Sequence, residues 1–562
     1  MQNRPPTPDF RSPTSRLLII GLDGGTWAAL GPLCEYGEMP NLARLRSQGA
    51  WADLLSTQPP FTAPAWSSIV TGVNPGKHGV LDFLHKPQDP ARSLRNEGTP
   101  VNSTHIQAPT VWAYLNAAQR QVGVMNFPLS YPLRPVDDFA ISGMLTPPNA
   151  SDWTHPPELA AELDEYVVEL NYGRPGKELR REDLPLPAQM LGDVSKMTER
   201  RGFNALKLMQ SRPWDVFAVV FTGTDRIYHH FWHYLQPADE EEARKLNFAL
   251  AEQLQRYFRL LDSIIGSLVR SAGSDANTLM ISDHGFGPGA RNWVHLNNWL
   301  LELDMLVLKT VSSGGWMQRI KRSAPWLSDI AKRILPQEAR QSLQRFGSLA
   351  DATDWPHTLA WVEPLYSNVA GIYLNRSDRY PGGPVKPAAA DHLCEAIIDQ
   401  APYLRVPGTK QALIRDIQKS HDLYHGPHVD KFPDLIVTLD PDHAVVSTLG
   451  PTLITPVPQL LRTGDHRPEG IFLAHGPDIQ PGHLSEPASL LDVAPTILHL
   501  AGAGIPPSMD GRVITEAIRP GHLSLHPPRR GRDLPPPPPP GALTDEDSDA
   551  VASRLRGLGY LD

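Results

Sequence analysis

Residues 17–25 read LLIIGLDGG, an apolar run that stops at a carboxylate and two glycines. A continuous apolar run of this length is typical of a strand that is buried on both faces of a parallel sheet. The glycine turn would place Asp23 at the carboxyl edge of that sheet, where open α/β folds bind their ligands. The stretch therefore predicts an α/β fold with a ligand site at its strand ends.

Two later stretches repeat this pattern. Residues 215–221 (DVFAVVF) lead to Asp225, and residues 278–281 (TLMI) lead to Asp283. Because the carboxyl ends of parallel strands share one edge, carboxylates that are far apart in the chain can converge there. Apolar residues spaced three and four apart between Leu246 and Leu268 predict a long helix that packs on the sheet. We predict a doubly wound, mostly parallel α/β sheet flanked by helices.

The remaining segments suggest how the chain is divided. Residues 1–14 are polar and proline-rich and are expected to be a disordered lead, and residues 15–519 are expected to form the catalytic α/β domain. Irregular, proline-broken regions at about 81–190 and 290–425 are interpreted as inserted caps, the second with helices at Leu296–Leu306 and Trp316–Ile334. The core strand pattern is expected to resume at 435–439 and 471–474. Residues 520–562 are interpreted as a proline-rich linker and a short helical tail, either solvated or able to dock on a partner.

Composition restricts the function classes. A net charge of -9 gives no basic field that could hold a nucleic-acid polymer. Cys34 and Cys394 are the only cysteines, which favours a reducing compartment. The sequence shows no apolar signal segment and no run long enough to span a membrane. We expect a cytoplasmic protein that acts on a small substrate without binding a membrane.

Histidines accompany the three carboxylates. Asp225 and His229 are four positions apart and would share a helix face, His284 follows Asp283 directly, and His466 stands on a glycine-containing loop. Carboxylate oxygens and imidazole nitrogens without thiolates suit Zn²⁺ or Mn²⁺ at a catalytic site. Six such groups imply two ions, which could neutralise a phosphoryl group and activate a hydroxyl. Five other histidines are expected to be structural: His78, His230, His233, His295 and His475.

Residues 61–72 (FTAPAWSSIVTG) place Thr62 where a polar turn becomes an apolar helix. Unpaired N–H groups and the positive end of the helix dipole favour an anion at that position, so Thr62 could be a nucleophile. Thr62 could equally be an ordinary N-cap, because threonine is common there.

Taken in order, these motifs resemble the alkaline phosphatase superfamily. They are Asp23, Thr62 ahead of a Val-Thr-Gly-x-x-Pro-Gly-x-His-Gly segment, the Asp225–His229 pair, Ser-Asp-His-Gly at 282–285 and Gly-x-His ending at His466. Within the superfamily they are most similar to the type I phosphodiesterase and nucleotide pyrophosphatase branch.

This resemblance implies a site and a mechanism. Asp225, His229 and His466 would hold one divalent cation, and Asp23, Asp283 and His284 would hold another beside Thr62, with Zn²⁺ favoured and Mn²⁺ as the alternative. Thr62 would attack phosphorus to give a phospho-threonine that water then releases. The implied enzyme hydrolyses phosphodiester, pyrophosphate or phosphomonoester bonds.

One departure concerns the phosphate contact. Related phosphodiesterases have an Asp-Asn pair shortly after the His-Gly loop, and this chain has Asp82-Phe83 there. Asn126, at the end of a predicted strand, is a candidate for the missing contact. Two alternatives to hydrolysis also stay open, a phosphomutase of the same superfamily and a metal-binding interaction protein without turnover.

Overall fold

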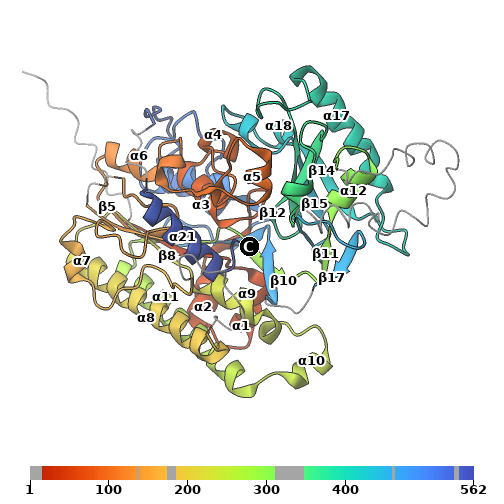
Figure 1. Ribbon diagram of the computed structural model, residues 1–562. Helices are drawn as coiled ribbons and strands as arrows, with labels where there is room; N and C mark the ends of the chain where they lie inside the picture. Colours follow the sequence, from red (N-terminus) through yellow and green to blue (C-terminus); the bar gives the residue numbers. More distant parts are fainter. Residues whose placement is uncertain are drawn as a thin grey trace, which may run out of the picture.

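A ten-stranded sheet forms the centre of the computed structural model (Figure 1). The structure describes residues 16–134, 136, 138–173, 185–309, 347–457, 462–536 and 543–561. The predicted lead at 1–14 and the predicted helix at Trp316–Ile334 lie outside these residues. The strand order is β20-β2-β19-β9-β1-β8-β5-β6-β7, and β21 pairs with β2. The strands are β1 (Leu17–Leu22), β2 (Ala50–Leu55), β5 (Val122–Phe127), β6 (Phe139–Ser142), β7 (Thr154–His155), β8 (Val216–Phe221), β9 (Asn277–Ile281), β19 (Glu469–His475), β20 (Gly482–His483) and β21 (Ala488–Ser489).

The middle of this sheet is parallel. β1 pairs in parallel with β8 on one side and with β9 on the other, and β8 continues in parallel through β5 to β6. β19 runs antiparallel to both β9 and β2. The mostly parallel α/β sheet that the sequence predicts is therefore confirmed. β5 and β6 belong to the principal sheet although they fall inside the region interpreted as the first cap, so that region is not entirely an insertion.

Helices cover both faces of the sheet. Successive residues of each buried strand point to opposite sides, and because the strands are apolar throughout, both faces must be shielded from water. Leu18, Ile20 and Leu22 of β1 pack in one hydrophobic cluster, and Leu17 and Ile19 pack in another. The first face is covered by α1 (Trp27–Glu35), α2 (Pro40–Gln48), α8 (Pro187–Ser211), α9 (Gly223–Leu235) and α11 (Phe248–Ala272), and the second by α3 (Thr62–Thr71), α6 (Val111–Ala117) and α19 (Val493–Leu500).

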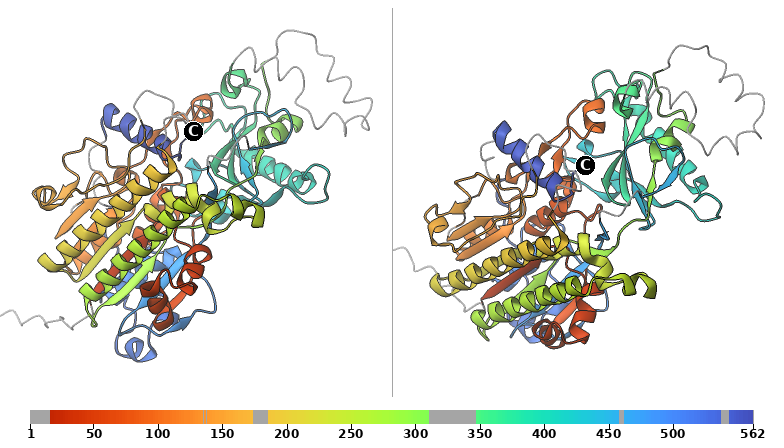
Figure 2. Two further views of the ribbon diagram at one scale, coloured as in Figure 1. Left: turned by 90° about the horizontal axis from the view of Figure 1, so that it is seen from below. Right: turned by 60° about the horizontal axis from the view of Figure 1, so that its bottom comes forward.

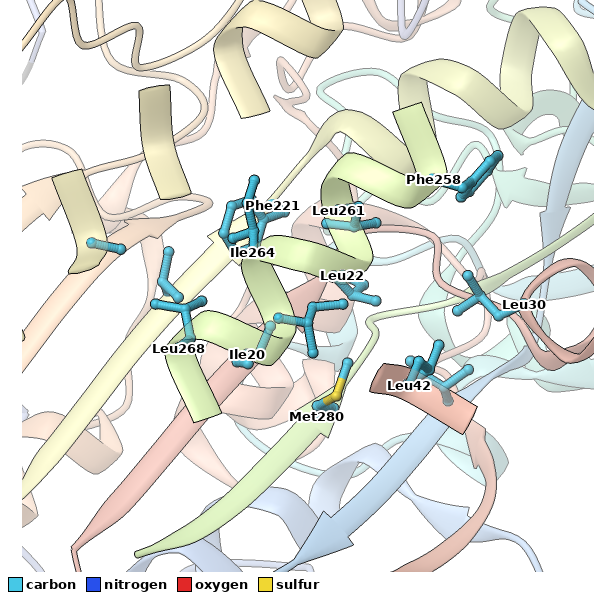
Figure 3. Close-up of a cluster of buried hydrophobic side chains, with 14 of the residues drawn as sticks. Ile20, Leu22, Leu30, Leu42, Phe221, Phe258, Leu261, Ile264, Leu268 and Met280 are labelled. Carbon is cyan, nitrogen blue, oxygen red and sulfur yellow. The ribbon is translucent and has the colours of Figure 1, made fainter. Parts of the chain in front are cut away.

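The long helix predicted from the apolar spacing is α11. Figure 2 shows α8 and α11 lying side by side along the sheet. Figure 3 shows Leu261, Ile264 and Leu268 of α11 beside Ile20, Leu22 and Phe221 of the strands, in one hydrophobic cluster. Burying side chains of this size contributes roughly 1.5–3 kcal/mol each, so this contact fixes the strand ends that carry the site.

A smaller lobe beside the principal sheet contains an antiparallel sheet of order β12-β13-β15-β14. Its strands are β12 (Ala360–Tyr366), β13 (Val369–Leu374), β14 (Ile414–Lys419) and β15 (Leu435–Leu439), covered by α12 (Leu296–Glu302) and α17 (Pro387–Gln400). A three-stranded sheet adds β11 (Asn292–Val294), β16 (His443–Val445) and β17 (Ile454–Pro456). The strand predicted at 435–439 exists, but it belongs to this lobe and not to the principal sheet.

Short elements complete the described chain. The short strands are β3 (Leu84–His85), β4 (Thr99–Pro100), β10 (Gly285–Pro288) and β18 (Gly464–Arg467). The short helices are α4 (Pro75–His78), α5 (Pro90–Leu94), α7 (Leu159–Glu162), α10 (Glu240–Lys245), α16 (Leu349–Ala352), α18 (Ser420–Leu423) and α20 (Pro520–Leu525). Turns of 3-10 helix lie at Ser103–His105, Ala401–Tyr403, Val429–Lys431, Leu490–Asp492 and Thr515–Ala517. Among the described helices, none combines the length and apolar character needed to cross a membrane.

The final described segment is helix α21 (Asp545–Gly557) with residues 558–561 after it. Thr544 caps the helix by accepting a hydrogen bond from the Asp547 N–H, and acidic residues fill its first turn. The acidic residues 545–547 are thus part of the helix. The apolar side chains of this segment pack on the chain itself, in a cluster with Phe61 and Phe83.

Candidate metal centre

The three predicted carboxylates meet at one edge of the principal sheet. Asp23 directly follows β1, Asp283 lies two residues after β9, and Asp225 lies in the first turn of α9 after β8. His229 is one helical turn further along α9, so it shares a face with Asp225. All four side chains are completely or almost completely buried.

A two-stranded ribbon brings the other histidines to this edge. β10 and β18 pair antiparallel, with Phe286 opposite His466, and His284 immediately precedes β10. His466 therefore lies on a strand rather than on the predicted loop. The rings of His284 and His466 stack with their centroids 3.5 Å apart.

Two groups of ligand atoms result, and Asp225 belongs to both. Asp225, His229 and His466 form the first group, which we call the α9 group, and Asp23, Asp225 and His284 form the second, the β1 group; within each, the ligand atoms lie within 4.8 Å of one another. In the α9 group His466 Nε2 lies 3.2 Å from both Asp225 Oδ1 and His229 Nε2. These are the sets in which the chain could hold metal ions.

Hydrogen bonds fix the tautomer of each histidine. Nδ1 of His229, His284 and His466 lies 3.2, 3.2 and 2.9 Å from the carbonyl oxygens of Gly464, Gly285 and Pro60, respectively. A carbonyl oxygen only accepts, so in each neutral ring the proton resides on Nδ1 and Nε2 presents a lone pair. Backbone support of this kind is the usual arrangement behind metal-binding imidazoles.

Two carboxylates, one in the β1 group and one beside it, have unsatisfied oxygens. Asp23 Oδ1 and Asp283 Oδ2 are buried without a hydrogen-bond partner among the described residues. Their other oxygens accept from the Trp66 indole N–H at 3.3 Å and from the Gly24 N–H at 3.0 Å. Asp283 Oδ2 lies 3.2 Å from His284 Nε2, so it borders the β1 group. Buried lone pairs that face one another are costly unless a cation lies between them, and these residues fit divalent cations.

Thr62 is the first residue of α3, and the residue in the N-cap position is Phe61. The Thr62 hydroxyl makes no capping bond, and its Oγ1 instead lies 3.4 Å from His284 Nε2. Thr62 is fully buried. The ordinary N-cap interpretation of Thr62 therefore does not hold, and the hydroxyl lies beside the β1 group at a helix N-terminus.

The electrostatics agree with this arrangement. Burial raises the pKa of Asp23 well above its ordinary value, and the nearby Asp283 and Asp225 carboxylates add to the shift. Burial also raises the pKa of Asp225, but His229, His466 and Arg226 outweigh that effect and hold it well below the ordinary value. Burial lowers the pKa of His466 well below the usual imidazole value, with a further contribution from His284, so this ring is neutral at pH 7.

Aromatic side chains enclose the centre. Tyr366 at the end of β12 stacks on His466 with centroids 4.0 Å apart, and Phe61 stacks on Tyr366 at 4.6 Å. Phe286 packs against His229 at 4.8 Å. The smaller lobe thus contributes a wall of the site through Tyr366, which the sequence did not suggest.

Two further polar residues near the site, Asn126 and Arg226, bond to other parts of the protein. Asn126 bonds to Tyr166 through its Oδ1 and donates to the Val168 carbonyl at 2.8 Å, so the structure gives no support to a phosphate contact by Asn126. Arg226 donates to Asp225 Oδ2 at 2.5 Å and pairs with Glu169 at 3.2 Å, which makes it a partner of the carboxylate rather than a free phosphate ligand.

Comparison with known proteins places these residues in a family. A sequence model of the family described as type I phosphodiesterase / nucleotide pyrophosphatase matches residues 17–478, a range that includes every residue of both groups. No curated protein sequence matches significantly.

Solved structures are similar to this chain at low sequence identity. Phosphonoacetate hydrolase from Sinorhizobium meliloti, crystallised with phosphonoformate, is 15% identical with a TM-score of 0.51, over 87% of this chain and 96% of the other. Murine ectonucleotide pyrophosphatase / phosphodiesterase 5 in complex with AMP is 15% identical with a TM-score of 0.47, over 90% of this chain and 100% of the other. The first of these supports the alkaline phosphatase-like fold.

Proposed function

Because the chain belongs to the type I phosphodiesterase / nucleotide pyrophosphatase family of hydrolases, we propose that it is a two-metal phosphohydrolase with Thr62 as its nucleophile. The observation that carries the proposal is the position of the Thr62 hydroxyl, at a helix N-terminus and 3.4 Å from the unprotonated Nε2 of His284. Cleavable bonds are phosphodiester, pyrophosphate or phosphomonoester bonds of a small phosphorylated substrate.

The two groups of ligand atoms divide the proposed metal binding. The α9 group would hold one cation, and Asp23, Asp283 and His284 would hold the other, with Asp225 within reach of both. Oxygen and nitrogen donors without thiolate favour Zn²⁺, with Mn²⁺ as the alternative. When bound, the two cations lower the pKa of the nucleophilic hydroxyl and neutralise the phosphoryl oxygens.

The protein side chains then position the reaction. The bond from Thr62 Oγ1 to phosphorus forms as the bond to the leaving oxygen breaks, and water in a second displacement cleaves the phospho-threonine and restores the hydroxyl. The first turn of α3 directs its dipole at the phosphoryl group. Tyr366 and Phe61 keep bulk water away from the reacting atoms, which strengthens each electrostatic contact there.

The test is hydrolysis of bis-p-nitrophenyl phosphate and p-nitrophenyl phosphate by purified protein with added Zn²⁺ or Mn²⁺. Thr62→Ala should lower the rate by at least roughly 10³-fold, and Thr62→Ser should retain part of it because the hydroxyl remains. Thr71→Ala is the matched control, since Thr71 lies in the same helix and its hydroxyl donates to the Ser67 carbonyl within that helix. Equal activity of wild type and Thr62→Ala would show that the nucleophile is another group.

The same assay separates the other two hypotheses. A phosphomutase would relocate the phosphoryl group within its substrate without releasing phosphate. A metal-binding protein without turnover would retain Zn²⁺ or Mn²⁺ and cleave neither ester. We also infer a cytoplasmic location, which the two unpaired cysteines favour.

A further inference from the structure

The segment formed by α21 and residues 558–561 lies against the candidate metal centre. Figure 1 and both views of Figure 2 place this end of the chain between the body that contains α8 and α11 and the smaller lobe. Val551, Leu555 and Tyr560 are buried in one cluster with Phe61, the residue before Thr62. The segment is therefore part of the wall of the site.

Close backbone contact fixes where this segment lies. A Cβ on Gly173 would fall 1.9 Å from the Ser553 carbonyl oxygen, so only glycine allows α21 to approach so closely. The buried Arg554 donates to the Thr146 carbonyl at 2.5 Å. These contacts anchor the helix and set the position of the residues that follow it.

Tyr560 reaches the α9 group directly. Its hydroxyl donates to Asp225 Oδ2 at 2.5 Å and accepts a hydrogen bond from Arg226 Nη1. The ring packs edge-on against Phe83, with centroids 4.9 Å apart, and the Arg226 guanidinium lies 5.0 Å from the ring centroid. The hydroxyl therefore has a fixed direction in a buried setting.

The two oxygens of Asp225 are consequently divided between two tasks. Oδ1 faces the α9 group, 3.2 Å from His466 Nε2 and 3.4 Å from His229 Nε2. Oδ2 accepts from Arg226 and Tyr560 on the opposite side. A carboxylate held in this way cannot rotate its Oδ1 away from the two imidazoles without breaking both hydrogen bonds.

The two donors to Oδ2 differ in charge. Arg226 also pairs with the buried Glu169, so its positive charge is shared with a second carboxylate. Tyr560 contributes a hydrogen bond without a charge, and so it orients Asp225 while leaving the negative charge of the carboxylate available to a cation. Outer hydrogen bonds of this type typically change metal affinity by about 10–100-fold.

We propose that Tyr560 is a positioning residue that fixes Asp225 for cation binding by the α9 group, so that the α21 segment completes the metal centre. This proposal rests on the proposed function only in requiring a divalent cation at that group. It concerns affinity for the cation rather than the chemistry of Thr62.

The experiment compares full-length wild type, Tyr560→Phe and Tyr131→Phe by competition with a chelator for Zn²⁺ and by the visible absorption spectrum of Co²⁺-substituted protein. Tyr131→Phe is the matched control, because the Tyr131 hydroxyl also donates to a carboxylate, Asp152 Oδ1 at 2.7 Å, but in another part of the molecule. We expect Tyr560→Phe to bind one of its Zn²⁺ ions about 10-fold less tightly and to shift the Co²⁺ bands, and Tyr131→Phe to match wild type. Excess Zn²⁺ should restore the activity of Tyr560→Phe, which it would not do if the variant were simply misfolded.

Several results would overturn the proposal. They are unchanged Zn²⁺ affinity and Co²⁺ spectrum in Tyr560→Phe, an equal loss of affinity in Tyr131→Phe, or hydrolysis by Tyr560→Phe that is faster than wild type, which would make the segment an obstruction. Absence of divalent-cation binding in wild type would overturn it together with the proposed function. If wild type binds Zn²⁺ but cleaves no ester, the proposed function fails, and the affinity measurement still decides the role of Tyr560.

Discussion

Buried histidines in two regions of this protein use their ring nitrogens in opposite ways. His78, at the end of α4, accepts from the Val80 N–H through Nδ1, so its proton resides on Nε2, which donates to Ser68 Oγ at 2.9 Å. In the candidate metal centre each histidine donates through Nδ1 to a backbone carbonyl, and the Nε2 lone pairs face one another. Both kinds are fully buried, so burial alone does not distinguish a structural histidine from a metal ligand. The difference between His78 and these three histidines lies in the direction in which Nδ1 bonds and in an Nε2 that is left facing other ligand atoms.

The largest effect on the contrast between structural and metal-binding histidines is expected from His466→Ala. Removing an Nε2 donor from the α9 group should lower phosphoesterase activity by roughly 10³-fold and reduce the metal content found by elemental analysis. His78→Gln should retain wild-type metal content. Equal metal content in His466→Ala and wild type would remove His466 from the proposed ligands.

Metal removal should produce the next largest effect. A cation present at about 100 times its dissociation constant stabilises the folded protein by about 2.7 kcal/mol, because it relieves the repulsion among the Asp23, Asp225 and Asp283 carboxylates. Thermal unfolding with and without a chelator measures this difference. His78→Gln should show the same chelator effect as wild type, and a chelator effect that disappears in His78→Gln would show that the two regions are not independent.

The third prediction concerns the pH dependence of stability that His78 causes. Burial, reinforced by nearby His428, lowers the pKa of His78 to about 3, while an unfolded histidine keeps its ordinary value. Between the folded and the unfolded pKa of His78, the unfolded state therefore binds more protons than the folded state. The contribution of neutral His78 to the free energy of unfolding is complete above the unfolded pKa and is lost as the pH falls toward about 3. When the pH is lowered from 7 to 5, protonation of residue 78 in the unfolded state should reduce the free energy of unfolding by about 2 kcal/mol.

The measurement is chemical denaturation of metal-free wild type and His78→Gln at both pH values. Glutamine does not titrate and can keep a donor near Ser68, so His78→Gln should lose less stability on acidification. Identical pH dependence in the two proteins would mean that His78 is accessible to protons in the folded state.

The smallest expected effect concerns the β1 group. Trp66→Phe removes the indole N–H that donates to Asp23 Oδ2, a hydrogen bond worth about 1 kcal/mol. Zn²⁺ affinity should fall by about 5-fold at one of the two sites and stay constant at the other, as read from a two-site binding isotherm. Equal weakening at both sites would indicate a general loss of packing instead.

Much of the centre could be predicted from the sequence, because its carboxylates follow apolar runs. β1, β8 and β9 are buried along their whole length, and that burial requires continuous apolar residues, which can be read directly. Asp225 and His229 could be paired because helical geometry relates positions four apart. Parallel pairing then brings the ends together.

An apolar run does not show which strand it will pair with. Residues 435–439 have the composition of a core strand, yet β15 pairs with β13 and β14 in the smaller lobe. His466 lies on a ribbon with β10, a pairing that depends on contacts across the chain. Tyr560 follows a proline run and a short helix whose docking surface comes from distant segments, so no local pattern connects it to Asp225.

Gly49 ends a helix, but for a reason that differs from the usual one. Residues 40–49 (PNLARLRSQG) are typical of a helix that ends at a glycine, and α2 does end at Gln48 with Gly49 in the C-cap position. Its φ of -116° is not left-handed, so the usual requirement of a helix C-terminus for glycine does not apply. A Cβ on Gly49 would instead fall 2.2 Å from the Ala474 carbonyl oxygen of β19, and it is this tertiary approach that excludes a side chain.

The pairing of β1 also has a consequence for biosynthesis. Leu17 pairs with Val216 and Asn277, so the first strand leaves the ribosome with neither neighbour yet made. At typical translation rates the about 200 intervening residues take roughly 10–40 s. During that time a wholly apolar strand is unprotected, and a holding chaperone that covers residues 17–22 until β8 has been synthesised should raise the yield of folded enzyme.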